Sequence, residues 1–463
     1  MSYRIETDSM GEFRVPEGAL YGAQTARAVD NFQVSGRPIG RELIAALGLI
    51  KRAAAWVNRE LGLLEPPLAE AISAAAEEVE RGELDAHFPV DVFQTGSGTS
   101  SNMNANEVIA NRAIARLGGV IGSKQPVHPN DHVNFGQSSN DVFPSAIHVA
   151  AMLLVERRLL PALAQLQGSL DRKAKEFDDI VKIGRTHLQD ATPIRLGQEL
   201  SGYASQVEHG AAHVRDTCAH LRELALGGTA VGTGINTHPE FGRRVAAKLA
   251  ELTGIPFVEA PNHFEAQGAQ DAAVALSGAL KTVAVGLMKI ANDLRWLASG
   301  PRLGLGELEI PPVQPGSSIM PGKVNPVIAE SLIMVCAQVI GNDAAIALGG
   351  LYGNFELNVM LPLIARNLLE QIALLANGAS QLAAKLVDGL RANSARIEAQ
   401  REGSLALATA LAPHIGYDRA AAIAKKAHAQ GLSLREAALG LGYVDAHDFD
   451  RWVDAAAMTR PGR

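Results

Sequence analysis

The loop GSSIMPGKVN, Gly316 to Asn325, contains the residue types in this chain that are best suited to chemistry. Its glycines and prolines by themselves predict only a loop. Its paired serines, lysine and asparagine indicate more, because an ammonium can neutralise one carboxylate and an amide can donate to another. Lys323 and Asn325 therefore suit a lid that closes over an anion. The chemistry expected of such a lid is removal of a proton from a carbon next to a carboxylate.

A second polar segment, Ser138, Ser139 and Asn140, directly precedes a stretch that predicts a long helix. The first N–H groups of a helix lack partners within the helix, so they and the short polar side chains form a suitable cradle for a carboxylate. The alternative is an ordinary N-cap with Asp141 in the first turn. The sequence leaves both interpretations open.

Two histidines just before this segment, His128 and His132, lie four residues apart with Asp131 between them, which suggests a metal site. Pro129 argues against a regular helix across these residues, so the two rings are not expected to share a helix face. We therefore expect no metal site here, and no metal elsewhere in the chain.

The polar segment Thr95–Asn106 contains Gly96 and Gly98, followed by a run of hydroxyl and amide side chains. A glycine turn with an N-cap for the following helix explains this pattern without a ligand. It is not a dinucleotide fingerprint, because no strand is expected before it and the third glycine is absent. Ligand binding by Ser97, Gly98 and Thr99 is the alternative.

His187 lies in a further polar segment, Gly184–Pro193, just before an apolar helical stretch. A single histidine before a helix is more often a hydrogen-bonded structural residue than a catalyst. Here its neighbours are Arg185, Thr186 and Gln189, a polarity that packing does not readily explain. We therefore keep His187 as a candidate for proton transfer.

Long helices must position these four segments. Between Leu196 and Leu221, and again between Leu276 and Leu297, apolar residues recur in steps of three and four, which predicts one buried stripe on each helix. Further helices are expected over residues 142–177, 327–348 and 361–386. Several long helices predict an elongated bundle, and their apolar area exceeds what one bundle hides, so we expect an oligomer.

The bulk composition fits a globular protein of 463 residues, with 47% hydrophobic and 20% charged residues. A net charge of −7 argues against a nucleic-acid partner. Two distant cysteines, Cys218 and Cys336, predict neither a disulfide framework nor a zinc site. The charged start is not typical of a secretory signal, and no stretch is expected to span a membrane. The expected compartment is the cytoplasm.

Together the four segments resemble the fumarase/aspartase superfamily, and within it the class II fumarases. The string GSSIMPGKVN is similar to the superfamily signature, and the likeness runs from Tyr21–Thr25 through all four segments in order. The resemblance implies a mainly α, three-domain fold, with a long central helix bundle that forms a 20-helix core in a homotetramer. The domains expected are an N-terminal one (1–136), a central bundle (137–391) and a small C-terminal one (392–463). Each active site would draw on three subunits.

The resemblance also implies residue roles. Ser317 would be the base that takes the C3 proton of malate, and His187, paired with Glu330, would handle the water that leaves or adds. No cofactor is implied, and the substrate would be a small dicarboxylate, fumarate or malate. The remaining implied substrate-binding residues are Ser97, Gly98, Thr99, Ser138, Ser139, Asn140, Thr186, Ser318, Lys323, Val324 and Asn325.

Two segments distinguish a hydratase from an ammonia-lyase. Aspartases resemble GRTQ where this chain has GRTH, Gly184 to His187, and they resemble GAGT where it has GSGT, Gly96 to Thr99. The implied reaction is the reversible anti addition of water to fumarate, giving (S)-malate through an aci-carboxylate, as in the citric acid cycle. Aspartate ammonia-lyase is the alternative, and a non-catalytic structural relative is a third hypothesis.

The chain departs from the class II pattern at a second carboxylate site, expected at His128, Pro129, Asn130 and Asp131. The basic residue usual a little upstream is displaced or missing, because that stretch reads Lys-Gln-Pro over residues 124–126. Gly136 also stands where a serine is common, and His132 where an aspartate is common. The strength of this second site is therefore doubtful.

Overall fold

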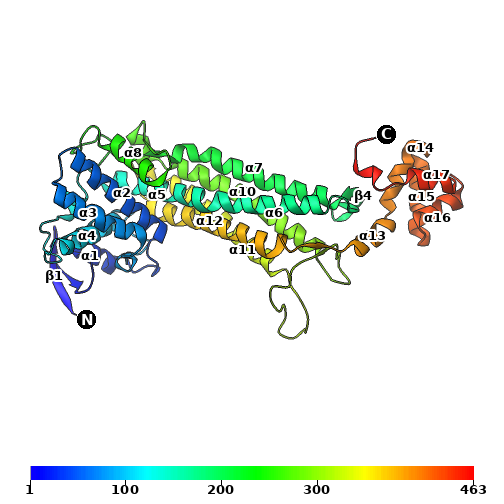
Figure 1. The fold of residues 1–463 in the computed structure, drawn as a ribbon, viewed down its shortest axis with the longest axis horizontal. Coiled ribbons are helices and arrows are strands. Elements are labelled where there is room, and N and C mark those ends of the chain that lie inside the picture. The colour runs from blue at the N-terminus through cyan, green and yellow to red at the C-terminus, as the bar shows by residue number, and fades with distance from the viewer. Residues whose placement is uncertain (1, 463) are drawn as a thin grey trace. The chain divides into compact units, whose positions relative to one another are not determined.

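The computed structural model describes residues 2–462, and it is mainly helical, as expected for the fold class (Figure 1). The chain forms two compact units, each built from three stretches of sequence. Unit 1 comprises Met1–Pro161, Gly210–Ala284 and Val335–Ala376, and unit 2 comprises Ala162–His209, Val285–Met334 and Asn377–Arg463. The three-domain division at residues 136 and 391 stays a prediction.

The elements fall into three groups. Unit 1 holds β1 (Tyr3–Asp8), β2 (Gly11–Pro16), α1 (Ala23–Asn31), α2 (Arg41–Glu60), α3 (Pro66–Arg81), α4 (Thr99–Arg116), α5 (Ser139–Leu154), β5 (Glu223–Leu224), α8 (Phe241–Thr253), β6 (Val258–Glu259), α9 (His263–Gly268), β8 (Gly353–Asn354) and β9 (Leu357–Asn358). Unit 2 holds β3 (Val181–Thr186), β4 (Gln189–Arg195), β7 (Leu308–Glu309), β10 (Arg391–Ala392), α13 (Ser394–Glu402), α14 (Ala412–Ile415), α15 (Tyr417–Gln430), α16 (Leu434–Leu441) and α17 (Ala446–Trp452). The other five helices contain residues of both units: α6 (Leu160–Glu176), α7 (Leu196–Leu221), α10 (Asp271–Leu297), α11 (Val327–Gly350) and α12 (Leu361–Leu382).

The stripes predicted on α7 and α10 are buried. Each of the fifteen stripe positions is at most 5% exposed: Leu196, Leu200, Tyr203, Val207, Ala211, Val214, Cys218, Leu221, Leu276, Leu280, Val283, Leu287, Ile290, Leu294 and Leu297. Steps of three and four place these side chains on one side of each helix, so burial of that side stabilises the helix by hydrophobic transfer. The long helices were thus predictable from periodicity.

The helix expected over residues 142–177 is interrupted. α5 ends at Leu154, a π-helical turn spans Val155–Leu159, and α6 then begins at Leu160. Pro161 lies in the first turn of α6, where its missing N–H leaves no helical hydrogen bond unmade. A second π-helical turn, Ala383–Val387, follows α12. A π-helical turn contains about one residue more than an α-helical turn, and the spacing of apolar residues does not reveal that insertion. Neither π-helical turn was therefore predicted.

Two helices, α10 and α11, are long and apolar enough to cross a membrane by length and composition, with mean hydropathies of 1.5 and 1.7. By these criteria the expectation that no stretch approaches a membrane span is wrong. Buried helices of soluble proteins pass the same test, and 56% of the apolar window of α10 is buried inside the chain. Only 33% of that of α11 is buried, and Met334 and Leu348 are largely exposed. α11 therefore has apolar surface that this chain alone does not cover.

Unit 1 gathers α2, α3, α4, α5 and α8 around a shared core. α2 is the clearest case, because Leu43, Leu47, Ile50 and Val57 are at most 2% exposed and face its neighbours. One residue breaks this apolar face: Lys51 is also completely buried. A buried lysine on an apolar helix face requires polar partners, which are described below.

Unit 2 contains the antiparallel β3–β4 hairpin and a C-terminal group of short helices. These helices share a core of their own, in which Leu411, Ile423 and Ala437 are fully buried. The hairpin register pairs Thr186 with Gln189, so only His187 and Leu188 form its turn. The sequence predicted a loop before a helix here, whereas the structure has a two-residue turn between strands.

Candidate active site

The segment around Gly98 forms the turn that begins α4. Gly98 has a φ of +72°, and a Cβ atom there would lie 2.3 Å from the Phe143 ring, so only glycine fits. The Gln94 side chain accepts from the backbone N–H of Ser101 at 3.0 Å. The Ser97 and Thr99 hydroxyls are hydrogen-bonded to each other at 2.7 Å. The backbone turn and Gln94 therefore cap α4. The hydroxyls of Ser97 and Thr99 lie at the N-terminus of this helix and, among the residues that the structure describes, make no capping hydrogen bond.

Ser138 caps α5, as the simpler sequence interpretation predicted. Its Oγ accepts from the Asn140 N–H at 3.2 Å, and its own N–H donates to Asp141 at 2.9 Å. Asp141 is fully buried and also accepts from the N–H groups of Gly227 and Thr229. Burial raises the pKa of its carboxyl to about 6, against the lowering effect of these donors.

One side-chain contact joins these two helix N-termini. The Asn102 amide, on the first turn of α4, donates to the Ser139 hydroxyl on α5 at 3.0 Å, and both side chains are buried. Within unit 1 the structure therefore brings the Ser97–Thr99 and Ser138–Asn140 segments to one place.

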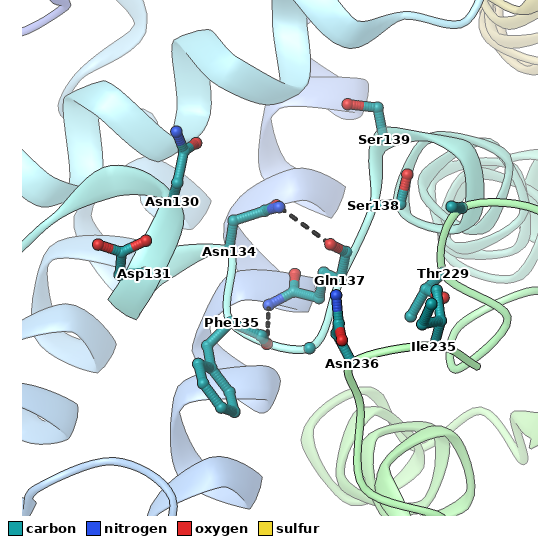
Figure 2. Close-up of a pocket in the computed structure, with 12 residues that line it drawn as sticks. Asn130, Asp131, Asn134, Phe135, Gln137, Ser138, Ser139, Thr229, Ile235 and Asn236 are labelled. Carbon is teal, nitrogen blue, oxygen red and sulfur yellow. Dashed lines mark hydrogen bonds between the residues drawn. The ribbon is translucent and has the colours of Figure 1, made fainter.

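A cavity of about 730 Å³ adjoins this place (Figure 2). It is lined by Asn130, Asp131, Asn134, Phe135, Gly136, Gln137, Ser138, Ser139, Thr229, Ala230, Ile235 and Asn236. Most of these residues belong to the segment before α5, Ser139 begins α5, and the other four come from the loop after β5. Asn130 and Asp131 of the expected second carboxylate site thus share a cavity wall with Ser138 and Ser139 of the first.

The second-site residues form a compact turn, Pro129–Val133, with π-helical hydrogen bonding. His128 caps it, because its Nδ1 accepts from the N–H groups of Asn130 and Asp131 at 3.2 Å. The His132 Nδ1 accepts from the His128 N–H at 2.8 Å. Both Nδ1 atoms are thus occupied by hydrogen bonds within this turn. Lys124, in the stretch where a cation was expected, instead donates to the Thr7 carbonyl.

In unit 2, Thr186, His187 and Leu188 lie exposed at the tip of the β3–β4 hairpin. His187 and Leu188 have φ angles of 56° and 61°, as a mirror-image two-residue turn requires. Positive φ is uncommon for a non-glycine residue and a genuine outlier for a bulky one, so the turn is strained. The turn places His187 at the exposed tip of the hairpin.

A buried group of charges fixes the base of the same hairpin. Glu307, 1% exposed at its side chain, contacts Lys182 at 2.9 Å and Arg185 at 2.5 Å. Lys182 also contacts Glu199 on α7 at 2.8 Å. The buried Lys182, the partly buried Arg185 and two carboxylates therefore anchor β3, five residues or fewer from His187.

The signature loop Gly316–Asn325 is held by few bonds and is mostly exposed. The Gly316 N–H donates to the Lys323 carbonyl at 2.8 Å, and the Asn325 amide donates to the Gly316 carbonyl at 2.5 Å. The Ser317 Oγ accepts from the N–H groups of Ile319 and Met320 at 3.2 and 2.9 Å. Two donors at this oxygen stabilise a negative charge on it, which is what a serine base needs.

Ser318, Lys323 and Val324 are exposed, while Glu330 is partly buried in the first turn of α11. In the part of the chain that the structure describes, no hydrogen bond or ion pair joins His187 to Glu330 or to Ser317. Their pairing stays a prediction. A cavity of about 560 Å³ lies beside residues 322–326 and is also lined by Arg295 and Arg391.

Three polar residues that hold the candidate site segments in place were not identified from the sequence: Lys51, Asn134 and Glu307. A lysine inside the apolar stripe of a helix was a usable signal for Lys51, because such a residue must be neutralised or hydrogen-bonded when buried. No comparable pattern marks Asn134 or Glu307, whose partners are distant in sequence.

Comparison with known proteins identifies the family of this chain. A family profile described as "Lyase" matches residues 11–341, and one described as "Fumarase C C-terminus" matches residues 407–460. These matches define the chain as a lyase. The curated relatives named "Fumarate hydratase class II" include one from Nitrosomonas europaea, 59% identical over 99% of each chain, and one from Ralstonia nicotianae, 58% identical over 99% of each chain. The chain belongs to the class II fumarate hydratase family.

Solved structures extend the likeness to the whole fold. The recombinant class II fumarase of Schistosoma mansoni has a TM-score of 0.97 and 41% identity, and the alignment covers 100% of both chains. A structure described as fumarate lyase:delta crystallin from Brucella melitensis, bound to cobalt, has a TM-score of 0.95 and 46% identity over 99% of this chain and 100% of that one.

Proposed function

We propose that this protein is a fumarate hydratase that converts fumarate and (S)-malate into each other by anti addition and elimination of water. Its family membership, at 59% identity over 99% of the chain, supports this reaction. The observation that carries the mechanism is the pair of backbone N–H groups donating to the Ser317 Oγ. They point to Ser317 as the base, because they favour the alkoxide over the neutral hydroxyl.

In the malate-to-fumarate direction, the Ser317 oxygen takes the C3 proton. The electron pair of that C–H bond moves into the neighbouring carboxylate, giving an aci-carboxylate. Lys323 and Asn325 stabilise the added negative charge, and preorganised donors of this kind supply a large share of catalytic power. The C2–O bond then breaks, and the hydroxyl leaves as water after it accepts a proton. His187, oriented by Glu330, handles that water.

The substrate carboxylates are proposed to bind at two places. Ser97, Gly98, Thr99 and Ser138–Asn140 form the cradle in unit 1, where helix N-termini favour an anion. Thr186, Ser318 and Val324 form the other substrate-binding place, in unit 2. The second carboxylate site at His128–Asp131 is proposed only as an accessory, because Lys124 is engaged with Thr7. No metal or cofactor enters this scheme.

The active enzyme is proposed to be a homotetramer whose sites draw residues from three subunits. The exposed apolar side chains of α10 and α11, including Val285, Met334 and Leu348, support burial of these helices against further copies. Such a 20-helix core also explains why both helices are unusually apolar for a globular protein. The compartment proposed is the cytoplasm, with neither nucleic acid nor membrane as a partner.

A side-by-side assay with fumarate, malate and aspartate tests the proposal. The purified protein is expected to change the ultraviolet absorbance of fumarate, and to form it from malate, without added metal. Faster release of ammonia from aspartate than of water from malate would establish the ammonia-lyase instead. The fold shared with the protein described as delta crystallin gives a third outcome, because inactivity on all three acids would indicate a structural role.

A further inference from the structure

Lys51 is a completely buried cation that none of the roles above uses. It lies on the apolar face of α2, between the buried Ile50 and Ala53. Its Nζ donates to the Asn134 Oδ1 at 2.8 Å and to the Gln137 Oε1 at 2.9 Å. Burying a charged ammonium is costly unless it is well hydrogen-bonded, so these two amides are its required partners.

The two amides hold the turn that leads into α5. The Asn134 Nδ2 donates to the Gln137 carbonyl at 3.1 Å, and the Gln137 Nε2 donates to the Phe135 carbonyl at 3.2 Å (Figure 2). The Gln137 Nε2 also donates to the Val133 carbonyl at 3.2 Å. Each amide thus turns its oxygen toward Lys51 and its nitrogen toward the backbone of the turn. The ammonium, which can only donate, fixes that orientation.

The same Asn134 oxygen reaches α4. It accepts from Asn106 at 3.1 Å and from Asn102 at 3.3 Å, in addition to Lys51. Asn102 in turn donates to the Ser139 hydroxyl at 3.0 Å. Three donors from two helices therefore meet at one oxygen, and the N-termini of α4 and α5 are linked through it.

Asp141 supplies the opposite charge. Its buried carboxylate accepts from Ser138, Gly227 and Thr229 and acts on Lys51 through its electric field. Burial lowers the pKa of Lys51 to about 7, and the charge of Asp141 opposes that shift. One donor group faces two amide oxygens, and the Lys51 nitrogen can donate to both of them in either protonation state.

We propose that Lys51 is a positioning residue for the carboxylate cradle of unit 1. Through Asn134 and Gln137 it sets how the Ser97–Thr99 and Ser138–Asn140 segments face one another, and hence how tightly they bind a dicarboxylate. This inference rests on the proposed function, in which those segments bind the substrate. Lys51 itself does not touch the substrate.

The test compares Lys51→Met with Leu47→Ala in the full-length protein. Lys51→Met keeps the length of the side chain but removes all donors, so KM for fumarate is expected to rise at least tenfold, with a smaller change in kcat. Leu47, also fully buried on α2, has no part in the amide network. Leu47→Ala should lower Tm by a comparable amount and leave KM within about twofold. Equal KM values for the two variants would overturn the proposal.

Lys51→Gln and Gln137→Met give the answer even if Lys51→Met fails to fold. Gln at position 51 can still donate to one amide, so KM should lie between those of the wild type and Lys51→Met. Gln137→Met removes one of the two bonds and is expected to raise KM threefold to tenfold. If both variants fold and bind fumarate as the wild type does, Lys51 is only a structural residue.

Calorimetric binding of succinate separates this inference from the proposed reaction. Succinate has both carboxylates but cannot lose water, so it reports on carboxylate binding without the reaction. If the wild type binds succinate but does not hydrate fumarate, the proposed function fails and the role of Lys51 is still decided by the affinities of the variants. An unchanged succinate affinity in Lys51→Gln and Gln137→Met would contradict the role of Lys51, whatever the reaction.

Discussion

The cradle in unit 1 and the reacting groups in unit 2 are built in opposite ways. Around Ser139 the side chains of Asn102, Lys51 and Asp141 are buried, and each makes hydrogen bonds to its neighbours. By contrast, His187, Ser318 and Lys323 are exposed. The groups expected to bind the substrate are therefore fixed in advance, whereas those expected to react lie in a strained turn and a sparsely bonded loop.

This difference follows from what each task needs. A carboxylate cradle gains affinity when its donors are already aligned, because less ordering is needed on binding. A serine base works only where water is excluded and positive charge is near, so its loop must let the substrate in before it closes. Lys323, exposed in this structure, is then the group whose surroundings change most on closure.

Ser317→Ala tests the reacting side most severely. The variant loses the oxygen to which both Ile319 and Met320 donate, and kcat should fall by about 10³-fold or more while KM stays nearly unchanged. Progress curves at saturating malate measure it. Ser318→Ala is the matched control, and it should cost far less in kcat. A Ser317→Ala variant with wild-type turnover would remove this serine from the mechanism.

Glu307→Gln tests whether the charges at the hairpin base stabilise unit 2 in the way that the buried network stabilises unit 1. Without the carboxylate, the buried Lys182 loses one of its two counter-charges and Arg185 loses its own, so unfolding free energy should fall by about 3 kcal/mol. Denaturant titration measures this, and kcat should fall as His187 loses its support.

Glu309→Gln is the control in the same segment. Glu309 pairs with Arg391 at the surface, where an ion pair contributes at most about 1 kcal/mol. If the two substitutions destabilise the protein equally, the buried group has no special role in holding the hairpin.

Burial also makes unit 1 sensitive to acid. The His148 ring on α5 is bonded through Nδ1 to the Glu223 carbonyl at 2.9 Å, and burial lowers its pKa to about 4. Between pH 6.5 and pH 4 the unfolded chain binds the proton and the folded chain does not, so stability falls as the pH falls through this window. The expected loss from pH 6.5 to pH 5 is about 2 kcal/mol. Denaturant titrations at both pH values measure this loss. The unfolding free energy of His148→Gln should fall by that much less over the same pH range.

Leu188→Gly is the mildest test. It relieves the left-handed strain at the hairpin tip but adds freedom to the unfolded chain, so the net gain in stability should be at most about 1 kcal/mol. Activity should stay within about twofold if the register of β3 and β4 alone directs His187. A loss of activity with unchanged stability would show that the rigid turn itself orients the imidazole. Thermal melts and kcat on the same samples decide between these outcomes.

Much of this molecule could be predicted from sequence, and the successes share a cause. The stripes on α7 and α10 depend on spacing within a few residues, and so do the cap at Ser138 and the loop at Gly316–Asn325. What could not be predicted depends on packing between distant segments. Lys51 and Asn134 are 83 residues apart, and Arg185 and Glu307 are 122 apart. Local patterns do not encode such contacts.

The hairpin shows the same limit at short range. Its strands were not recognised because Val181–Thr186 has no clean alternation and lies immediately before a strongly helical stretch. Two non-glycine residues at positive φ are also not what turn preferences predict. Sequence reasoning therefore identified His187 as a candidate but not the turn that presents it.

The burial of the two cysteines has a practical consequence for following loop closure. Cys218 and Cys336 are at most 1% exposed, and burial raises the pKa of their thiols to about 11 and about 12. Almost no thiolate is present at neutral pH, and the thiolate is the species that alkylating reagents attack. A cysteine introduced at exposed Met320 is then the preferred target for a fluorescent maleimide. A Met320→Cys variant that keeps both native cysteines can therefore report the movement of the signature loop as a dicarboxylate binds.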